Sequence, residues 1–183
     1  MPRIPVIEQE VELPENIEAM VEGLKVIVRG PKGEVQRDFS DSRIRILKEN
    51  NKIKVLAGLV RKKEKARIGT YIAHIKNMIK GVTEGFEYRL KIVYSHFPLT
   101  VEPKEKEVLI KNYIGERSPR IAKVQGEKTI VSVEGDDVIV EGINKEDVAQ
   151  TAANIQQSTR LRGRLRKDFR VFMDGVYIYS KGK

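Results

Sequence analysis

The chain has 183 residues, of which 35 are Lys or Arg and 26 are Asp or Glu, so its net charge is +9. A basic balance of this size favours partners with negative fields, such as nucleic acid or an anionic membrane surface. The absence of cysteine excludes disulfides and thiolate metal sites, and no window approaches the roughly 18 apolar residues of a membrane span. A cytoplasmic location is compatible with this composition.

The first half of the chain predicts short strands joined by tight turns. Strand signals begin at Val11-Glu-Leu13 and continue at four apolar or alternating segments, which are 24–28, 35–39, 44–47 and 53–56. Gly30-Pro-Lys-Gly33 is typical of a turn, because glycine tolerates positive φ and proline presets its own. Asn50-Asn51 predicts a hairpin between its flanking strands.

A helix is predicted after these strands. Apolar residues recur there at steps of three and four, namely Ile68, Ile72, Ile75, Ile79 and Val82. Gly81 suits a C-cap of this helix. The segment before the helix is interpreted as a basic loop that could contact RNA or could be only a solvated face; its basic residues are Arg61, Lys62, Lys63, Lys65 and Arg67.

The second half repeats this order. Residues 87–95, 100–102, 107–110 and 120–124 have strand patterns, and Gly135-Asp136 joins 129–133 to 138–140 as a hairpin. Asn144 is expected to cap a second helix, whose apolar stripe is Val148, Ala152 and Ile155. The fold class is therefore predicted to be α+β, with two tandem copies of a small antiparallel sheet packed against one helix. We expect one domain at residues 1–82 and the second at residues 83–183.

The segment at residues 158–170 is the strongest functional signal. Four arginines alternate with Leu161, Gly163 and Leu165, so an extended conformation would place them on one face. Guanidinium groups match phosphate oxygens in pairs and stay charged at any working pH. We interpret the segment as a nucleic-acid-binding strip rather than a solvated charge run; its basic residues are Arg160, Arg162, Arg164, Arg166, Lys167 and Arg170. By contrast, residues 1–23 carry a net charge of −5.

A turn at Asp174-Gly175 is expected to fold residues 176–179 back against residues 169–173, which would fix the strip in one conformation. Aromatic residues make up only 6% of the chain, so phosphate and shape contacts rather than base stacking would dominate RNA binding.

Signals for catalysis are few. His74 and His96 are 22 positions apart, and neither has a second histidine at metal-ligand spacing. A hydrolase that uses one of them with a carboxylate is one alternative. A free-standing RNA-binding or chaperone-like module is another. No cofactor, metal site or catalytic residue is predicted, and membrane attachment is the least favoured reading, since no strongly amphipathic basic helix is evident.

Two stretches give the chain a resemblance to a known family. One is Gly69-Thr-Tyr-Ile-Ala-His-Ile-Lys-Asn-Met-Ile-Lys-Gly-Val-Thr-Glu-Gly-Phe-Glu-Tyr88, followed by Tyr94-Ser-His-Phe-Pro98. The other is Lys167-Asp-Phe-Arg-Val-Phe-Met-Asp-Gly-Val-Tyr-Ile-Tyr-Ser-Lys181. Over essentially its whole length the chain resembles the archaeal and eukaryotic branch of the large-subunit ribosomal protein L six family.

This resemblance implies two tandem domains of one repeated fold and no enzymatic activity. It also implies binding to large-subunit rRNA, mainly through the C-terminal domain, near the sarcin–ricin loop and the factor-binding region. Neighbouring ribosomal proteins, and translation factors nearby, are the other partners it suggests. Lys181 lies within the second stretch and joins the candidate rRNA-binding residues.

Overall fold

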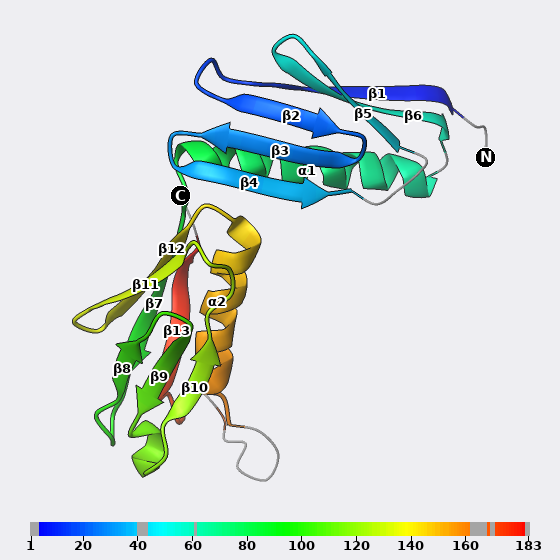
Figure 1. Cartoon of the computed structure of the whole chain (residues 1–183). Coiled ribbons are helices and arrows are strands. Elements are labelled where there is room, and N and C mark those ends of the chain that lie inside the picture. The colour runs from blue at the N-terminus through cyan, green and yellow to red at the C-terminus, as the bar shows by residue number, and fades with distance from the viewer. Residues whose placement is uncertain (1–3, 40–43, 61, 162–167, 169–170, 182–183) are drawn as a thin grey trace. The chain divides into compact units, whose positions relative to one another are not determined.

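A computed structural model of the chain describes residues 4–39, 44–60, 62–161, 168 and 171–181. The chain forms two compact units, residues 1–85 and 86–183 (Figure 1). The division falls after Gly85, three residues beyond the position expected from the sequence. Each unit has its own hydrophobic core, and each contains one long helix.

Unit 1 holds two three-stranded antiparallel sheets. The first has the order β1-β6-β5, with β1 at Ile4–Glu12, β6 at Lys52–Val60 and β5 at Ile44–Glu49. The second has the order β2-β3-β4, with β2 at Glu18–Glu22, β3 at Lys25–Gly30 and β4 at Gly33–Asp38. Strand β2 had no clear signal in the sequence. The predicted turns are confirmed, since Gly30 faces Gly33 and Asn50 lies between β5 and β6 with a φ of 50°.

Helix α1, Lys62–Thr83, covers the core of unit 1 with the predicted stripe. Ile68, Ile75 and Val82 are almost completely buried. The prediction that Gly81 caps the helix is wrong, because Gly81 is a buried residue inside α1. The cap role belongs to Gly85, whose φ of 80° is in the left-handed region and whose N–H donates to the Lys80 carbonyl oxygen at 3.2 Å.

Unit 2 has the same sequence of elements, with a 3₁₀ turn and a last strand added. Its strands are β7 (Phe86–Val93), β8 (Thr100–Pro103), β9 (Glu107–Lys111), β10 (Arg120–Lys123), β11 (Thr129–Glu134), β12 (Asp137–Gly142) and β13 (Gly175–Lys181). A 3₁₀ turn at Tyr113–Gly115 precedes β10, and helix α2 spans Lys145–Ser158. As predicted, Asn144 caps α2: its side-chain oxygen accepts a hydrogen bond from the Glu146 N–H at 3.2 Å.

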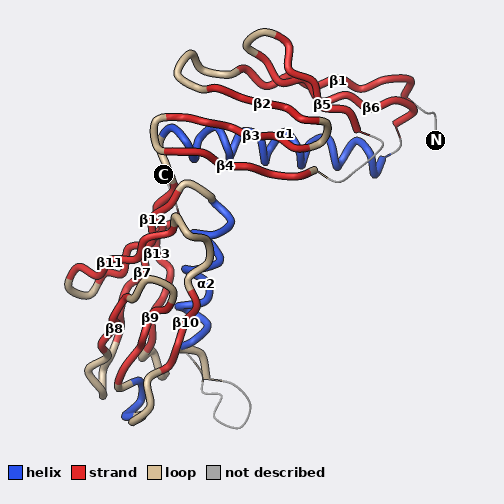
Figure 2. The backbone as a smooth tube through the Cα atoms, viewed as in Figure 1, coloured by secondary structure: helices blue, strands red, loops and turns tan. Residues whose placement is uncertain are grey.

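The strand orders show that the two units share one topology. In unit 1 the first strand, β1, pairs with the last, β6, which pairs with β5; in unit 2, β7 pairs with β12, which pairs with β11. The three strands after the first form a separate sheet in each unit. The difference is β13, which pairs antiparallel with the other edge of β7 (Figure 2).

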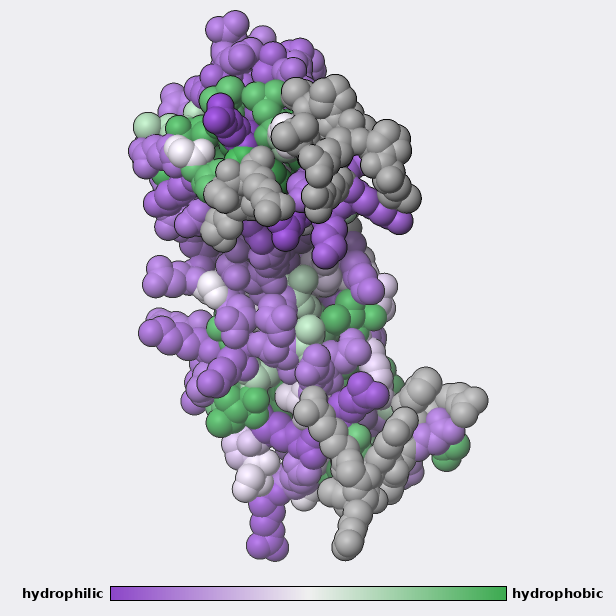
Figure 3. Space-filling view, turned by 90° about the vertical axis from the view of Figure 1, so that its right-hand side faces the viewer, coloured by the Kyte–Doolittle hydropathy of each residue, from purple (hydrophilic) through white to green (hydrophobic). Residues whose placement is uncertain are grey.

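The predicted α+β class is confirmed, with two helices and four small antiparallel sheets among the described residues. Each unit packs two sheets against its helix, where the sequence suggested one. The reason is that the second, third and fourth strands of each unit pair only with one another. Hydrophilic side chains cover most of the face seen in Figure 3. Most of the apolar side chains are buried in the two cores or packed against them.

Candidate nucleic-acid interface

The structure describes the residues that precede and follow the arginine-rich segment in the chain. Arg160 and Leu161 follow α2 directly, and Asp168 and residues 171–174 lead into β13. Arg160 is exposed. Five predicted RNA-binding residues lie outside the described residues, namely Arg162, Arg164, Arg166, Lys167 and Arg170. What the structure contributes is the pair of anchors that hold the two ends of this segment.

The first anchor joins the end of α2 to the start of β13. The Thr159 hydroxyl donates to the Gln156 carbonyl oxygen at 3.0 Å and accepts a hydrogen bond from the Val176 N–H at 3.0 Å. The Gln156 side-chain oxygen accepts from the Ile178 N–H, also at 3.0 Å. Thr159 is 5% exposed and Val176 is fully buried, so the bond between them is sheltered from water. The helix end and the strand are therefore fixed to each other.

Arg120 supports the same helix end. It donates two hydrogen bonds of 2.7 Å to the two oxygens of Glu116 and one of 2.8 Å to the Ser158 carbonyl oxygen. Its guanidinium also lies 4.3 Å from the centroid of the Tyr113 ring. A cation at the C-terminal end of a helix is favoured by the helix dipole. The hydrogen bonds with Arg120 lower the pKa of the Glu116 carboxyl, and those with Glu116 raise the pKa of Arg120.

The second anchor is the buried carboxylate of Asp174. Its oxygens accept hydrogen bonds from the N–H groups of Ser95 at 3.0 Å and His96 at 3.5 Å, just beyond the end of β7. The His96 ring stacks on Phe172, with centroids 5.8 Å apart and planes 10° apart. The Phe172 N–H in turn donates to the Asp168 carbonyl oxygen at 2.9 Å. Asp168 and residues 171–174 are thereby tied to the loop after β7.

These anchors correct the expected fold of the tail. Residues 176–179 do not fold back on residues 171–173; they form part of β13, in which Gly175 faces Val93 and Ile178 faces Leu90. The Asp174 carboxylate instead accepts hydrogen bonds from the backbone N–H groups of Ser95 and His96, 79 and 78 positions earlier in the chain. A pairing over that distance leaves no signal in the local sequence.

The structure separates Lys181 from the other candidate residues. It faces Tyr88 at the far end of β13, while Gly175 faces Val93 at the near end. Six residues of strand span about 20 Å. Lys181 is exposed. It therefore belongs to a different part of the surface of unit 2 from Arg160.

The interpretation of residues 61–67 as a loop is wrong for its described part. Lys62, Lys63, Lys65 and Arg67 all lie in the first two turns of α1, and Arg61 lies outside the described residues. The four side chains are exposed, while Glu64 among them is 7% exposed. The early helix start is explained by Ile68 and Glu64, whose burial on the same face extends the helical stripe toward the N-terminus.

The histidines do not assemble a catalytic group. His96 Nδ1 is 3.9 Å from Asp174 Oδ1, but both oxygens of that carboxylate accept hydrogen bonds from backbone N–H groups. His74 lies on α1, with its ring centroid 6.3 Å from that of Phe39. Within the described ranges, no three His, Asp or Glu side chains are grouped so as to hold a metal ion. Neither helix there is long and apolar enough to cross a membrane.

Reasoning from the sequence missed the residues that hold the segment in place. Thr159, Gln156 and Arg120 have no distinguishing pattern, because the partners that tie them to other elements lie 17 to 38 positions away. The pair Asp174-Gly175 was noticed in the sequence, but an acid before a glycine indicates a turn and not a buried hydrogen-bond acceptor.

Comparison with known proteins identifies a family that spans most of the chain. The model of the ribosomal protein L6 family matches residues 13–85 and 97–175. A protein of Staphylothermus marinus named large ribosomal subunit protein uL6 is 52% identical over 186 aligned positions, covering 100% of this chain and 99% of the relative. Proteins of the same name from Methanobrevibacter smithii and Methanococcus vannielii are 49% and 46% identical, and cover 96% and 99% of the chain and 96% and 97% of their own lengths. The chain belongs to the ribosomal protein L6 family.

Proposed function

We propose that this protein is a structural constituent of the large ribosomal subunit that binds large-subunit rRNA through unit 2. The site we propose is the arginine-rich segment between α2 and β13, near the sarcin–ricin loop and the factor-binding region of the subunit. The observation that carries the proposal is the double anchor of this segment, by Thr159 at one end and Asp174 at the other. The family is one of ribosomal proteins and is not known for catalysis.

The mechanism is electrostatic. The arginines and Lys167 neutralise phosphates and release counterions, while the anchors fix where this charge is presented. Ordering the two ends of the segment before binding lowers the entropy that is lost when the complex forms. The charge of Arg120 is already compensated by Glu116, so it serves the anchor rather than the RNA.

Two weaker contacts complete the proposal. Lys181 would touch a separate stretch of RNA, because it lies at the other end of β13. The exposed residues Lys62, Lys63, Lys65 and Arg67 at the start of α1 form a candidate secondary contact, together with Arg61. Neighbouring ribosomal proteins, and translation factors nearby, are the further partners we propose.

The test is the salt dependence of binding to large-subunit rRNA. With roughly five phosphate contacts, the slope of log affinity against log salt should be about −3 to −5. Changing Arg164 and Arg166 together to alanine should flatten it by about one or two units. The matched control changes Lys104 and Lys106, two exposed cations between β8 and β9, to alanine and should leave the slope unchanged.

A nearly flat salt dependence, or equal effects of the two double variants, would overturn the proposed interface. A second variant tests the role of the anchor. A Cβ at Gly175 would lie 3.3 Å from Thr159 Oγ1 and from the Tyr177 ring, so Gly175→Val should weaken binding with every basic residue in place. The alternative of a free-standing RNA-binding module predicts that the protein sediments apart from ribosomes in a cell extract.

A further inference from the structure

Comparison of the two units shows that no described strand of unit 1 corresponds to β13. In unit 2, β13 pairs with the edge of β7 that β12 leaves free, and it also contacts the end of α2. In unit 1, among the described residues, β1 pairs only with β6, and the corresponding space is a groove of about 610 Å³. The groove is lined by one stretch of β1 and its following turn and by the C-terminal half of α1, namely Glu10, Val11, Glu12, Pro14, Lys76, Ile79, Lys80, Thr83 and Glu84.

Burial along the two first strands supports this comparison. The inward residues of β7 at 86, 88, 90 and 92 are all buried. Along β1 the same alternation gives a buried Val11, but Gln9 is exposed and Ile7 is half-buried. An edge strand offers unpaired N–H and C=O groups that a further strand can use. Strand β1 therefore has both an open edge and an incompletely covered inner face.

The helix side of the groove repeats a detail of unit 2. Thr83, the last residue of α1, donates from its hydroxyl to the Lys80 carbonyl oxygen at 3.0 Å. Thr159, just after α2, makes the same bond to the residue three positions earlier and also accepts the Val176 N–H. A hydroxyl has two acceptor lone pairs, so Thr83 can receive a strand N–H in the same way.

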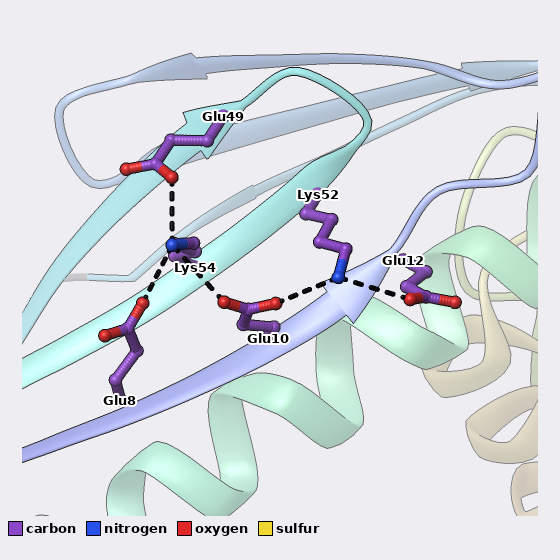
Figure 4. A network of polar contacts seen from close by, with 6 residues as sticks. All are labelled: Glu8, Glu10, Glu12, Glu49, Lys52 and Lys54. Atoms are coloured by element: carbon purple, nitrogen blue, oxygen red, sulfur yellow. Dashed lines mark hydrogen bonds and ion pairs between the residues drawn. The ribbon is translucent and has the colours of Figure 1, made fainter.

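The outer face of β1 determines which strand fits. Glu8, Glu10 and Glu12 lie in a row there, and Glu10 and Glu12 stand directly opposite Lys54 and Lys52 (Figure 4). Lys54 Nζ lies 2.9–3.3 Å from carboxylates of Glu8, Glu10 and Glu49. These contacts raise the pKa of Lys54, and hydrogen bonds with Lys52 and Lys54 lower the pKa of Glu10. The network has four carboxylates for two ammonium groups, so its excess charge is negative.

A strand added beside β1 sets its side chains directly opposite those of β1 on each face. Its outward side chains would face Glu8, Glu10 and Glu12 and should be Lys or Arg, while its inward ones would face Ile79 and Val11 and should be apolar. We propose that the groove between β1 and α1 binds an extended protein segment of alternating basic and apolar residues, which pairs antiparallel with β1. A second copy of β1 is disfavoured because like-charged rows would meet, and RNA is disfavoured because phosphates would face carboxylates.

This inference goes beyond the proposed function, since it concerns unit 1 and does not require RNA binding. The probe is the peptide Lys-Val-Lys-Thr-Lys-Val-Lys, acetylated and amidated at its ends, added to the ¹⁵N-labelled full chain. We expect saturable shifts of amide signals confined to β1 and the last two turns of α1. The same peptide with alternate backbone nitrogens methylated keeps its charges but cannot pair as a strand, and should bind at least about tenfold more weakly.

Matched variants test the two sides of the groove. Glu10→Gln with Glu12→Gln should weaken peptide binding about tenfold, while Glu18→Gln with Glu22→Gln on β2 should change it less than about threefold, because distant charges are screened at physiological salt. Thr83→Val should weaken binding about fivefold, the effect of one hydrogen bond. The control Thr70→Val removes a hydroxyl bonded to the Ala66 carbonyl oxygen elsewhere on α1 and should be silent.

Three results would overturn the proposal. The first is equal binding of the methylated peptide, which would reduce the effect to charge alone. The second is displacement of the peptide by a short duplex RNA that shifts the same β1 signals, which would assign the groove to RNA. The third is self-association of the protein that Thr83→Val abolishes, since this would make a second copy the occupant.

Discussion

The two units share a topology but differ in how they close the edge of their first strand. Strand β7 has β12 on one side and β13 on the other, and its inner residues are all buried. Strand β1 has β6 on one side, and no described residue pairs with its other edge. The same fold therefore completes its sheet in unit 2 with β13, and no described residue takes the equivalent position in unit 1.

This difference goes with a difference in the charged residues beside the two strand edges. The segment that leads to β13 carries the arginines, and the described residues on its two sides are held by hydrogen bonds of Thr159 with Val176 and of Asp174 with Ser95. The open edge in unit 1 lies beside a row of carboxylates instead. One extra strand thus distinguishes the two copies of the fold, because β13 covers the second edge of β7 and is preceded by the arginine-rich segment.

The largest expected effect is on hydrogen exchange. Because β7 is paired on both edges, its amides at residues 88–91 should all be protected by the stability of unit 2. Along β1, one alternate set of amides faces the groove and should exchange at least about 1,000-fold faster, a difference of about 4 kcal/mol. Amide exchange followed by NMR on the full chain checks this. Uniform protection along β1 would mean that both of its edges are paired, which would contradict the difference between β1 and β7.

The second prediction concerns the buried acceptor of unit 2. Asp174→Ala leaves the N–H groups of Ser95 and His96 without their charged acceptor, so the free energy of unfolding of unit 2 should fall by about 2–3 kcal/mol. Urea denaturation measures the change. Asp174→Asn keeps an acceptor oxygen and should lose less. An equal loss in both variants would show that the charge, not the geometry, carries the anchor.

A smaller effect is expected at the contact between α2 and β13. Thr159→Val keeps the shape of the side chain but removes the acceptor for the Val176 N–H, which should cost about 1–2 kcal/mol of stability. Thr159→Ser retains the hydroxyl and should remain close to wild type. The two variants are compared by urea denaturation, and a serine variant as unstable as the valine variant would contradict the role of the hydroxyl.

The smallest effect depends on pH. Hydrogen bonds with Arg120 hold the pKa of Glu116 below its ordinary value of 4.5. The pair therefore stabilises unit 2 fully above about pH 4.5, and this contribution is lost as the pH falls through the lowered pKa of the folded state. Since the Glu116 side chain is 38% exposed, solvent screening limits the contribution to less than about 1 kcal/mol. Glu116→Gln should make stability less dependent on pH below 4.5, as measured by thermal denaturation across that range.

Local features were the part of the fold that the sequence revealed well. The turn at Asn50, the hairpin at Gly135 and the Asn144 cap all follow from the conformational preferences of single residues. The stripes of α1 and α2 were equally clear, because burial on one helix face imposes a period of three to four residues. Strand β2 escaped detection because only Ala19 and Val21 of its five residues are apolar and inward-facing.

Of the candidate site, the sequence predicted the basic residues but not the residues that hold the segment in place. Alternating arginines indicate phosphate binding through their own chemistry, which needs no tertiary contact to be recognised. The supports of the segment were not predictable in this way. Thr159, Arg120 and Asp174 are ordinary residues whose roles come from partners that the chain brings near only after folding.

The amino-acid sequence by itself determined most of the element types, the repeat and the basic segment, because these depend on periodicity, turn residues and side-chain charge. Tertiary structure alone decided that β13 pairs with β7 and not with the residues just before it. It also decided that no described residue pairs with the edge of β1 beside the groove at α1. The physical reason is that strand pairing is set by which edges remain open after the cores have packed, and no short stretch of sequence records that choice.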